Sequence, residues 1–151
     1  MAYACTRRLT QLSDVSDQIF ASKALGDGFV VKPTANKIYS PISGTVDSVF
    51  DTKHAITIKN KDGINVLLHM GVDTVELNGV PFTIHVVAGN RIKAGDLLAE
   101  VDLGYLSEQG KSDEIITVFP DLSDKATINI EGYGSTFDES KAIGSISLTS
   151  L

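Results

Sequence analysis

The chain has 151 residues, which suits a single domain that buries roughly two-thirds of its unfolded surface. No apolar run approaches the roughly 20 residues that a membrane-spanning helix needs, and the first residues lack the apolar core of a secretory signal. The single cysteine excludes an internal disulfide, so we expect a cytoplasmic protein. The net charge of −6 argues against nucleic-acid binding, which needs a basic surface.

Short β-branched runs separated by Gly, Asp, Asn and Pro recur about every ten residues, a spacing typical of an antiparallel sandwich or barrel. Two short helical turns are predicted at residues 18–23 and 105–108. For residues 1–11 the sequence does not distinguish between a strand and an irregular segment. The predicted strands are 28–32, 37–40, 44–50, 55–59, 66–69, 82–87, 97–101, 115–119, 127–131 and 145–149.

Two histidines lie in neighbouring strand-like segments. His54 precedes an alternating segment with one wet face, whereas His69 ends a nearly continuous apolar run. Between them, Asp62-Gly63 is a favourable two-residue hairpin turn, and a hairpin there would bring the two imidazoles side by side. Such a pair suits phosphoryl transfer, because one ring nitrogen accepts the group while the second ring steadies it. On spacing alone, two ordinary strand histidines fit equally well.

A weak internal echo links residues 40–46 with residues 92–98. Each segment places a glycine turn before a strand, as the two halves of a barrel-sandwich hybrid motif do. Similar Pro-x-x-Gly and Ala-Gly-Asp sequences occur in many β-turns.

Six segments taken together closely resemble the glucose-type enzyme IIA domain of the bacterial phosphoenolpyruvate-dependent sugar phosphotransferase system. The segment around His69 is the most specific, and the resemblance runs from about residue 12 to residue 151. It implies one domain over residues 1–151, folded as an all-β, flattened antiparallel β-sandwich with a duplicated hybrid motif. The matching segments are residues 15–21, 26–33, 40–46, 52–55, 68–79 and 94–98.

The resemblance also implies a function as a histidine phosphocarrier. His69 would accept a phosphoryl group from the phosphocarrier protein HPr and pass it to a cysteine of enzyme IIB during sugar uptake, with His54 beside it. No cofactor, nucleic acid or membrane insertion is implied. In some relatives the unphosphorylated form also binds regulatory targets. The sequence does not specify the sugar, nor whether the domain is free-standing or part of a larger permease.

Each proposed role has a physical reason. His69 would attack with a neutral ring nitrogen, its other nitrogen held protonated by a backbone carbonyl. His54 would donate a hydrogen bond to the phosphate, and the Thr52 hydroxyl would accept from the remaining nitrogen of His54. An apolar rim around the pair would exclude water and dock the partners. The rim is expected to contain Phe29, Phe50, Leu67 and Val75.

Four further residues complete the expected partner-binding set. Asp73 is expected near His69, where it would meet arginines of the partner, although Gly-Val-Asp-Thr is also typical of a turn. Asp27 is either a near-site carboxylate or a turn residue, and Glu76 either a rim charge or a solvated one. Gly71 is included in the partner-binding set because it belongs to the segment around His69 that resembles the family. By contrast, His85 is expected to have a structural role only.

Two other protein classes compete with this interpretation. In a zinc hydrolase, His69 and Asp73 would match the first metal motif of lysostaphin-type peptidases, with His54 as third ligand, but the required His-x-His pair is missing. No resident metal is therefore expected, although His54 and His69 could bind zinc adventitiously. In a biotinyl or lipoyl carrier the modified lysine would have to be Lys53, whose neighbours do not fit that motif.

Overall fold

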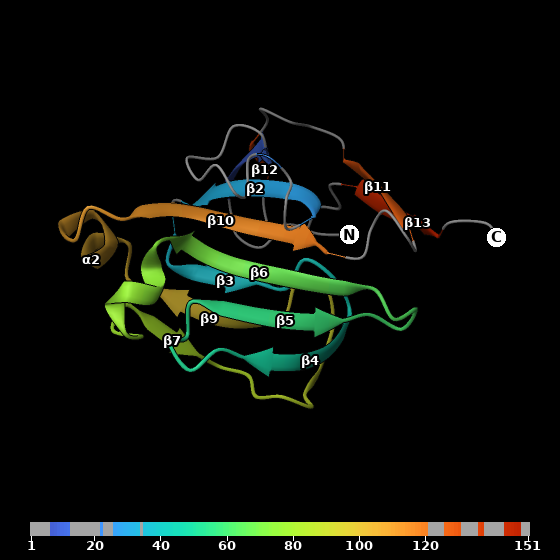
Figure 1. Cartoon of the computed structure of the whole chain (residues 1–151), viewed down its shortest axis with the longest axis horizontal. Helices are drawn as coiled ribbons and strands as arrows, with labels where there is room; N and C mark the ends of the chain where they lie inside the picture. Colours follow the sequence, from blue (N-terminus) through green and yellow to red (C-terminus); the bar gives the residue numbers. More distant parts are fainter. Residues whose placement is uncertain are drawn as a thin grey trace.

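Two antiparallel sheets stack face to face in the computed structural model (Figure 1). The structure describes residues 7–12, 22, 26–33, 35–120, 126–130, 136–137 and 144–148, and side chains only for residues 12, 22, 26–33 and 35–120. The larger sheet has eight strands in the order β12-β1-β2-β10-β6-β5-β4-β8, and the smaller has three in the order β3-β9-β7. β11 (Ala126–Ile130) pairs separately with β13 (Gly144–Leu148).

The strands are short, as the spacing of the β-branched runs predicts. In the larger sheet they are β12 (Thr136–Phe137), β1 (Arg7–Gln11), β2 (Asp27–Pro33), β10 (Ser112–Phe119), β6 (Asn65–Val72), β5 (Ala55–Lys59), β4 (Gly44–Val49) and β8 (Arg91–Ile92). In the smaller sheet they are β3 (Lys37–Tyr39), β9 (Leu97–Val101) and β7 (Phe82–Ile84). The helical elements of the described residues are α2 (Leu103–Glu108) and the 3₁₀ turn η2 (Thr74–Leu77).

The main hydrophobic core fills the space between the two sheets. Ile56, Leu68 and Met70 from the larger sheet meet Ile38 and Leu98 from the smaller one, all with no exposed surface. Because strand side chains alternate between faces, the residues directly before and after Leu68 point away from this core. Leu67 and His69 therefore lie on the outer face of β6, opposite the core.

A second, smaller apolar cluster lies on that outer face. Val30, Ile116 and Val118 are fully buried there, and Leu67 packs against them while staying half-buried. Ile116 pairs with both Val30 and His69, so the cluster adjoins the strand position of His69.

The predicted all-β sandwich is confirmed, and the bounds of 55–59 and 97–101 agree with β5 and β9. β6 and β10 are longer than predicted and β7 shorter, while the two-residue β8 and β12 were not predicted at all. The segment left open at the N-terminus contains β1. The predicted turn at 105–108 lies in α2, and the one at 18–23 lies outside the described residues except for Ser22.

The β5–β6 hairpin forms where predicted, but its turn type was predicted wrongly. The Gly63 amide donates to the carbonyl of Asn60, and the Asn60 amide to the carbonyl of Ile64, so Lys61 and Asp62 are the central turn residues. Gly63 follows with φ of +78°. The side chain of Asn60 decides this geometry, because its oxygen accepts from the amides of both Asp62 and Ile64.

The two echoed segments contact each other directly. The Ser40 amide donates to the carbonyl of Asp96, and the Gly95 amide to the carbonyl of Ser40. The Ser43 hydroxyl accepts from the Ala94 amide at 2.9 Å. These hydrogen bonds hold the two glycine-containing turns against each other.

Candidate active site

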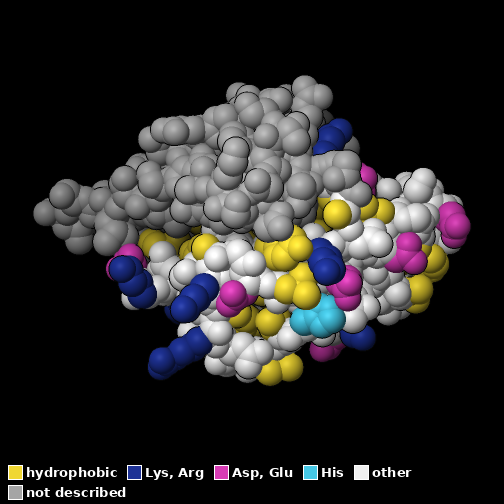
Figure 2. All heavy atoms as spheres, turned by 180° about the vertical axis from the view of Figure 1, so that it is seen from behind, with side chains coloured by type: hydrophobic (Ala, Val, Ile, Leu, Met, Phe, Trp, Pro, Cys, Tyr) yellow, Lys and Arg dark blue, Asp and Glu magenta, His cyan; other side chains and the backbone are white. Residues whose placement is uncertain are grey.

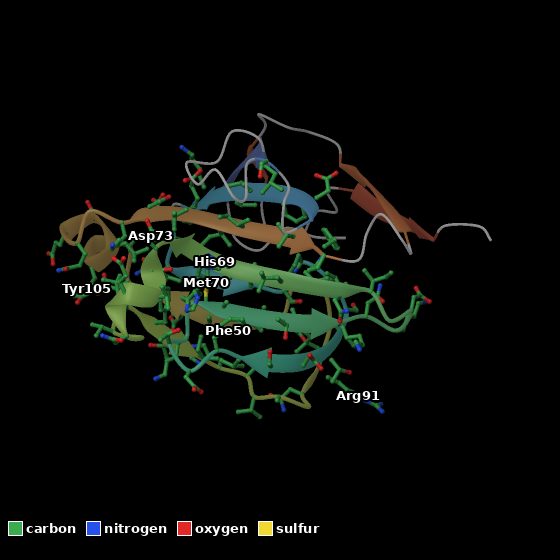
Figure 3. The ribbon with its side chains drawn as sticks, viewed as in Figure 1. Phe50, His69, Met70, Asp73, Arg91 and Tyr105 are labelled. Atoms are coloured by element: carbon green, nitrogen blue, oxygen red, sulfur yellow. The ribbon has the colours of Figure 1, made fainter. Side chains whose placement is uncertain are left out.

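The hairpin brings His54 and His69 together, as predicted. Ala55 pairs with His69 across β5 and β6, and the Met70 amide donates to the carbonyl of His54. The two imidazoles meet edge to face, with ring centroids 4.9 Å apart and an interplanar angle of 77°. Figure 3 shows His69 on β6 close to Phe50, at the end of the strand that leads to Asp73.

A backbone carbonyl fixes the tautomer of His69. Its Nδ1 lies 2.6 Å from the carbonyl oxygen of Gly71, and a carbonyl can only accept, so Nδ1 carries the proton. In a neutral ring Nε2 then holds the lone pair and is the nucleophilic nitrogen.

The backbone at Gly71 is shaped for this contact. Gly71 has φ of +82°, and a Cβ there would lie 2.5 Å from Cγ2 of Thr74 and 2.6 Å from the carbonyl oxygen of Ser112. Thr74 is itself fully buried, and its hydroxyl donates to the carbonyl of Met70 at 2.6 Å. The pairing of β6 with β10 is irregular here, between Ser112 and Ile115. Only glycine fits this position.

His54 is the more deeply buried ring, only 6% exposed. Its Nδ1 lies 2.6 Å from the hydroxyl oxygen of Thr52, and Phe50 packs edge-on against it at 5.4 Å between centroids. Burial lowers the pKa of His54 from its ordinary value, because desolvation penalises the charged ring. A neutral His54 can present Nε2–H to a phosphate only if the Thr52 hydroxyl donates to Nδ1, the reverse of the direction expected from sequence.

The backbone also prepares this position. Lys53 has φ of +61°, and its amide donates to the carbonyl of Phe50 in a tight turn between β4 and β5. The Phe50 amide in turn donates to the carbonyl of Ala55. This turn brings the side chains of Thr52 and His54 within hydrogen-bond distance of each other.

Two of the four predicted rim residues, Phe50 and Leu67, lie beside the pair, and Val75 lies in η2 beyond the end of β6. Phe50 and Val75 are 41% and 47% exposed, and half-buried Leu67 lies two residues before His69 on the same face of β6. Phe29 was assigned to the rim wrongly, since it is fully buried. It pairs with Thr117, which pairs with Leu68, so it shares the inner face and packs 6.4 Å from the ring of Phe119.

The carboxylates occupy different surroundings. Asp73 is exposed, has φ of +58° and directly precedes η2, which agrees with the turn alternative given for Gly-Val-Asp-Thr. Glu76 in that turn forms an ion pair with Lys111. Asp27 lies three residues from Val30, about 10 Å further along β2, and its Oδ1 accepts from the Gly28 amide at 2.8 Å. Asp27 begins β2 and pairs with Phe119 of β10, so it lies in a strand and not in a turn.

The competing protein classes find less support in the geometry of the described residues. Among them, no group of three or more His, Cys, Asp or Glu side chains is placed to hold a metal, so His54, His69 and Asp73 do not assemble the hydrolase ligand set. His85 is exposed and its Nε2 lies 2.9 Å from Oε2 of Glu100, as expected for a structural residue. None of the described helices has the length and apolarity to cross a bilayer.

Residues 2–125 match the family described as phosphoenolpyruvate-dependent sugar phosphotransferase system, EIIA 1. The chain belongs to this family. It is similar to the glucose-specific EIICBA component of the phosphotransferase system from Streptococcus pneumoniae serotype 4 (strain ATCC BAA-334 / TIGR4), with 43% identity over 128 residues. That match covers 85% of this chain but only 18% of the relative, so the chain spans less than a fifth of that protein's length.

A solved EIIA structure shares the fold. The glucose permease IIA from Mycoplasma capricolum superposes with a TM-score of 0.83 at 33% identity, over 97% of this chain and 92% of that one. The family resemblance found in the sequence is therefore confirmed.

Substituting Gly71 with alanine should destabilise the protein more than the same change at Gly63. Both glycines have φ near +80°, but a Cβ at Gly63 meets nothing within 4 Å. Gly63→Ala should cost about 1–2 kcal/mol for the left-handed backbone. Gly71→Ala should cost about 1–3 kcal/mol more for the clash with Thr74 and Ser112. Denaturant unfolding of both variants tests this, and equal losses would contradict the steric argument.

The buried, neutral His54 should make stability depend on pH. Its pKa is lowered in the folded state, so the unfolded chain binds the proton more readily, and stability falls as pH drops below about 6.5. The free energy of unfolding should therefore fall for the wild type relative to His54→Gln between pH 7 and pH 5.5, by at most about 1.4 kcal/mol per pH unit. Parallel curves for the two proteins would show that His54 is not desolvated.

Proposed function

We propose that the chain is a phosphoryl carrier of a bacterial sugar phosphotransferase system, acting in the cytoplasm. In this proposal Nε2 of His69 accepts the phosphoryl group from phospho-HPr and a cysteine of enzyme IIB receives it. The observation that carries it is the hydrogen bond from His69 Nδ1 to the carbonyl of Gly71, beside the ring of His54.

The first transfer is a displacement at phosphorus. The Nε2 lone pair of His69 forms the new N–P bond, and the bond between phosphorus and the donor atom of HPr breaks. The proton on Nδ1 stays in place because it is hydrogen-bonded to the carbonyl oxygen of Gly71. His54 supports the transferred group through Nε2–H while Thr52 holds its other nitrogen, a fixed dipole in a water-poor setting.

The second transfer reverses these roles. The thiolate of enzyme IIB attacks phosphorus and the N–P bond of His69 breaks. Because Nδ1 keeps its proton, the phosphorylated ring is cationic and leaves as neutral imidazole. We expect loss of the hydrogen bond from His54 to slow this step most.

The surroundings of the pair suit two successive partners. Phe50, Leu67 and Val75 provide an apolar border that excludes water, and Asp73 and Glu76 add charge at its edge. A small apolar centre with a charged rim is typical of transient protein interfaces. Gly71 contributes through the backbone of β6, and Asp27 lies further away at the start of β2.

Incubation with phosphoenolpyruvate, enzyme I and HPr tests the function itself. Phosphate should appear on the protein as an acid-labile, base-stable adduct. Absence of labelling with active enzyme I and HPr would refute the proposal. The sugar is determined by the partner that contains enzyme IIB and not by this chain. Binding of regulatory targets by the unphosphorylated form could use the same surface.

His69→Gln should abolish acceptance of phosphate from phospho-HPr, because the nucleophile is lost. His54→Gln should leave acceptance largely intact but slow donation to enzyme IIB by roughly 10²-fold or more. His85→Gln, which removes a histidine paired with Glu100, is the matched control and should match the wild type in both steps. Normal sugar phosphorylation by the His54 variant would refute its role.

Val75→Asp should raise the KM for phospho-HPr about tenfold, because a docking protein would bury the new carboxylate without a partner. Val87→Asp is the matched control, since Val87 is 64% exposed and lies outside the proposed rim. The comparison uses initial rates of phosphorylation at varied HPr concentration. Equal effects of the two changes would place the docking surface elsewhere.

A further inference from the structure

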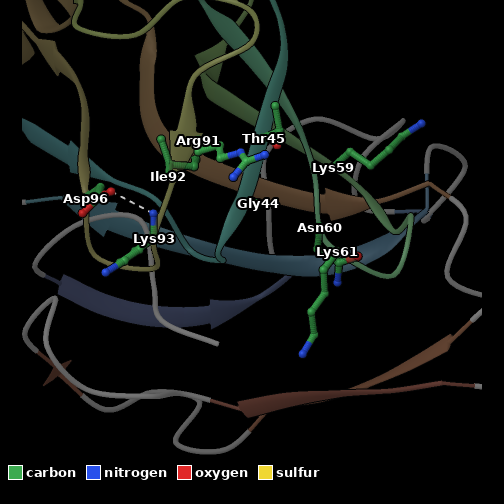
Figure 4. Close-up of a pocket in the computed structure, with 9 residues that line it drawn as sticks. All are labelled: Gly44, Thr45, Lys59, Asn60, Lys61, Arg91, Ile92, Lys93 and Asp96. Atoms are coloured by element: carbon green, nitrogen blue, oxygen red, sulfur yellow. Dashed lines mark hydrogen bonds between the residues drawn. The ribbon is translucent and has the colours of Figure 1, made fainter.

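A basic pocket of about 600 Å³ lies at the end of the sheet remote from the histidine pair. Its walls come from the β5–β6 turn, from β4 and β8, and from the turn that follows β8. Figure 4 shows Arg91, Lys61 and Lys93 around it, whereas the side chain of Lys59 points away from the other lysines. The pocket is lined by Gly44, Thr45, Lys59, Asn60, Lys61, Arg91, Ile92, Lys93 and Asp96.

Strand register places the pocket away from His69. Thr45 pairs with Arg91 on one side and with Lys59 on the other, so these exposed side chains share one face. Lys59 lies four residues beyond Ala55, the partner of His69, or about 13 Å along β5. In Figure 3, Arg91 and Asp73 lie at opposite ends of the molecule.

The pocket is built from tightly packed backbone. A Cβ on Gly44 would lie 2.4 Å from the carbonyl oxygen of Lys59, so glycine lets β4 approach the β5–β6 turn closely. Ile92, only 7% exposed, anchors β8 in the main core beside it. The oxygen of the Asn60 side chain accepts from the amides of Asp62 and Ile64, which turns its NH₂ group away from the turn backbone.

Positive charge is concentrated at this pocket although the protein as a whole is acidic. The protein carries −6, yet four of its 13 basic residues line this one pocket. Within the part of the chain that the structure describes, none of the four forms an ion pair. The single acidic lining residue, Asp96, already accepts a hydrogen bond from the Lys93 amide at 2.8 Å. A bound anion would be attracted by this group of positive charges.

We propose that this pocket binds a phosphate-bearing small molecule, independently of phosphoryl transfer at His69. The guanidinium of Arg91 offers the paired donors that match a phosphate group, and the ammonium groups of Lys61 and Lys93 add mobile charge. The volume lies within the range of small-molecule sites, which favours a soluble phosphate ester as the ligand. Figure 2 shows the gathering of basic side chains at one end of the molecule.

The probe is inorganic pyrophosphate, titrated into the unphosphorylated full chain without HPr or enzyme IIB. Amide shifts in the NMR spectrum should move at residues 59–63 and 91–96 and stay unchanged at His54 and His69. Calorimetry should show that Arg91→Gln weakens binding about tenfold or more, the effect of losing a charge-assisted hydrogen bond. Lys32→Gln, which removes an exposed charge from β2, should bind as the wild type.

Three outcomes would overturn the proposal. Pyrophosphate shifts confined to the histidine pair would show that the basic pocket is not the site. Equal weakening by Arg91→Gln and Lys32→Gln would reduce the effect to net charge. Binding only to vesicles that contain phosphatidic acid, with none to soluble pyrophosphate, would assign the pocket to a membrane surface. Since the amide shifts are measured on the wild type, the localisation holds even if Arg91→Gln folds poorly.

Discussion

The pairing register of β5 and β6 is the constraint on which the site depends. With Ala55 opposite His69, the residue before Ala55 is brought beside the outer face of β6, and the imidazoles meet at 4.9 Å. A slip of one residue would turn His69 into the core and Leu68 out of it. Because Leu68 and Met70 have no exposed surface, the core itself opposes that slip. Core packing and active-site geometry are therefore set by the same alternation.

Backbone irregularities then refine what the register begins. Lys53, Gly71 and Asp73 all have positive φ; Lys53 directly precedes His54, and Gly71 and Asp73 follow His69. Such conformations cost free energy and persist where surrounding contacts hold them. At Gly71 the result is a carbonyl aimed at Nδ1 of His69, and at Lys53 it is a turn that presents Thr52 to His54. The regular sheet positions each ring, and the irregular turns supply the hydrogen-bond partner of its Nδ1.

Much of the fold was predictable from sequence, because β-branched runs between turn residues mark strands clearly. The histidine pair followed from the hairpin signal, although the turn proved to be set by the Asn60 side chain instead of Asp62-Gly63 alone. Phe29 shows the limit of the method. In a continuous apolar run such as Gly28 to Val31, alternation gives no sign of which residue faces the core. Its face is settled only by its pairing with Thr117, which pairs in turn with the buried Leu68.

Other features needed three-dimensional contacts that no local pattern encodes. The direction of the hydrogen bond between Thr52 and His54 depends on burial of the ring, which lowers its pKa. The basic pocket joins residues about 30 positions apart through the short strand β8, whose two residues carry no recognisable strand pattern. The family resemblance located the chemistry, but it did not indicate either of these arrangements.

The central claim is that Nε2 of His69 is the nucleophile because Gly71 holds the proton on Nδ1. Long-range proton–nitrogen NMR correlation on protein with ¹⁵N-labelled histidine measures this directly. In the unphosphorylated protein Nδ1 of His69 should be protonated and Nε2 unprotonated, and phosphorylation should produce phosphorus coupling at Nε2. A proton on Nε2 of the neutral ring, or phosphorus coupling at Nδ1, would contradict the account.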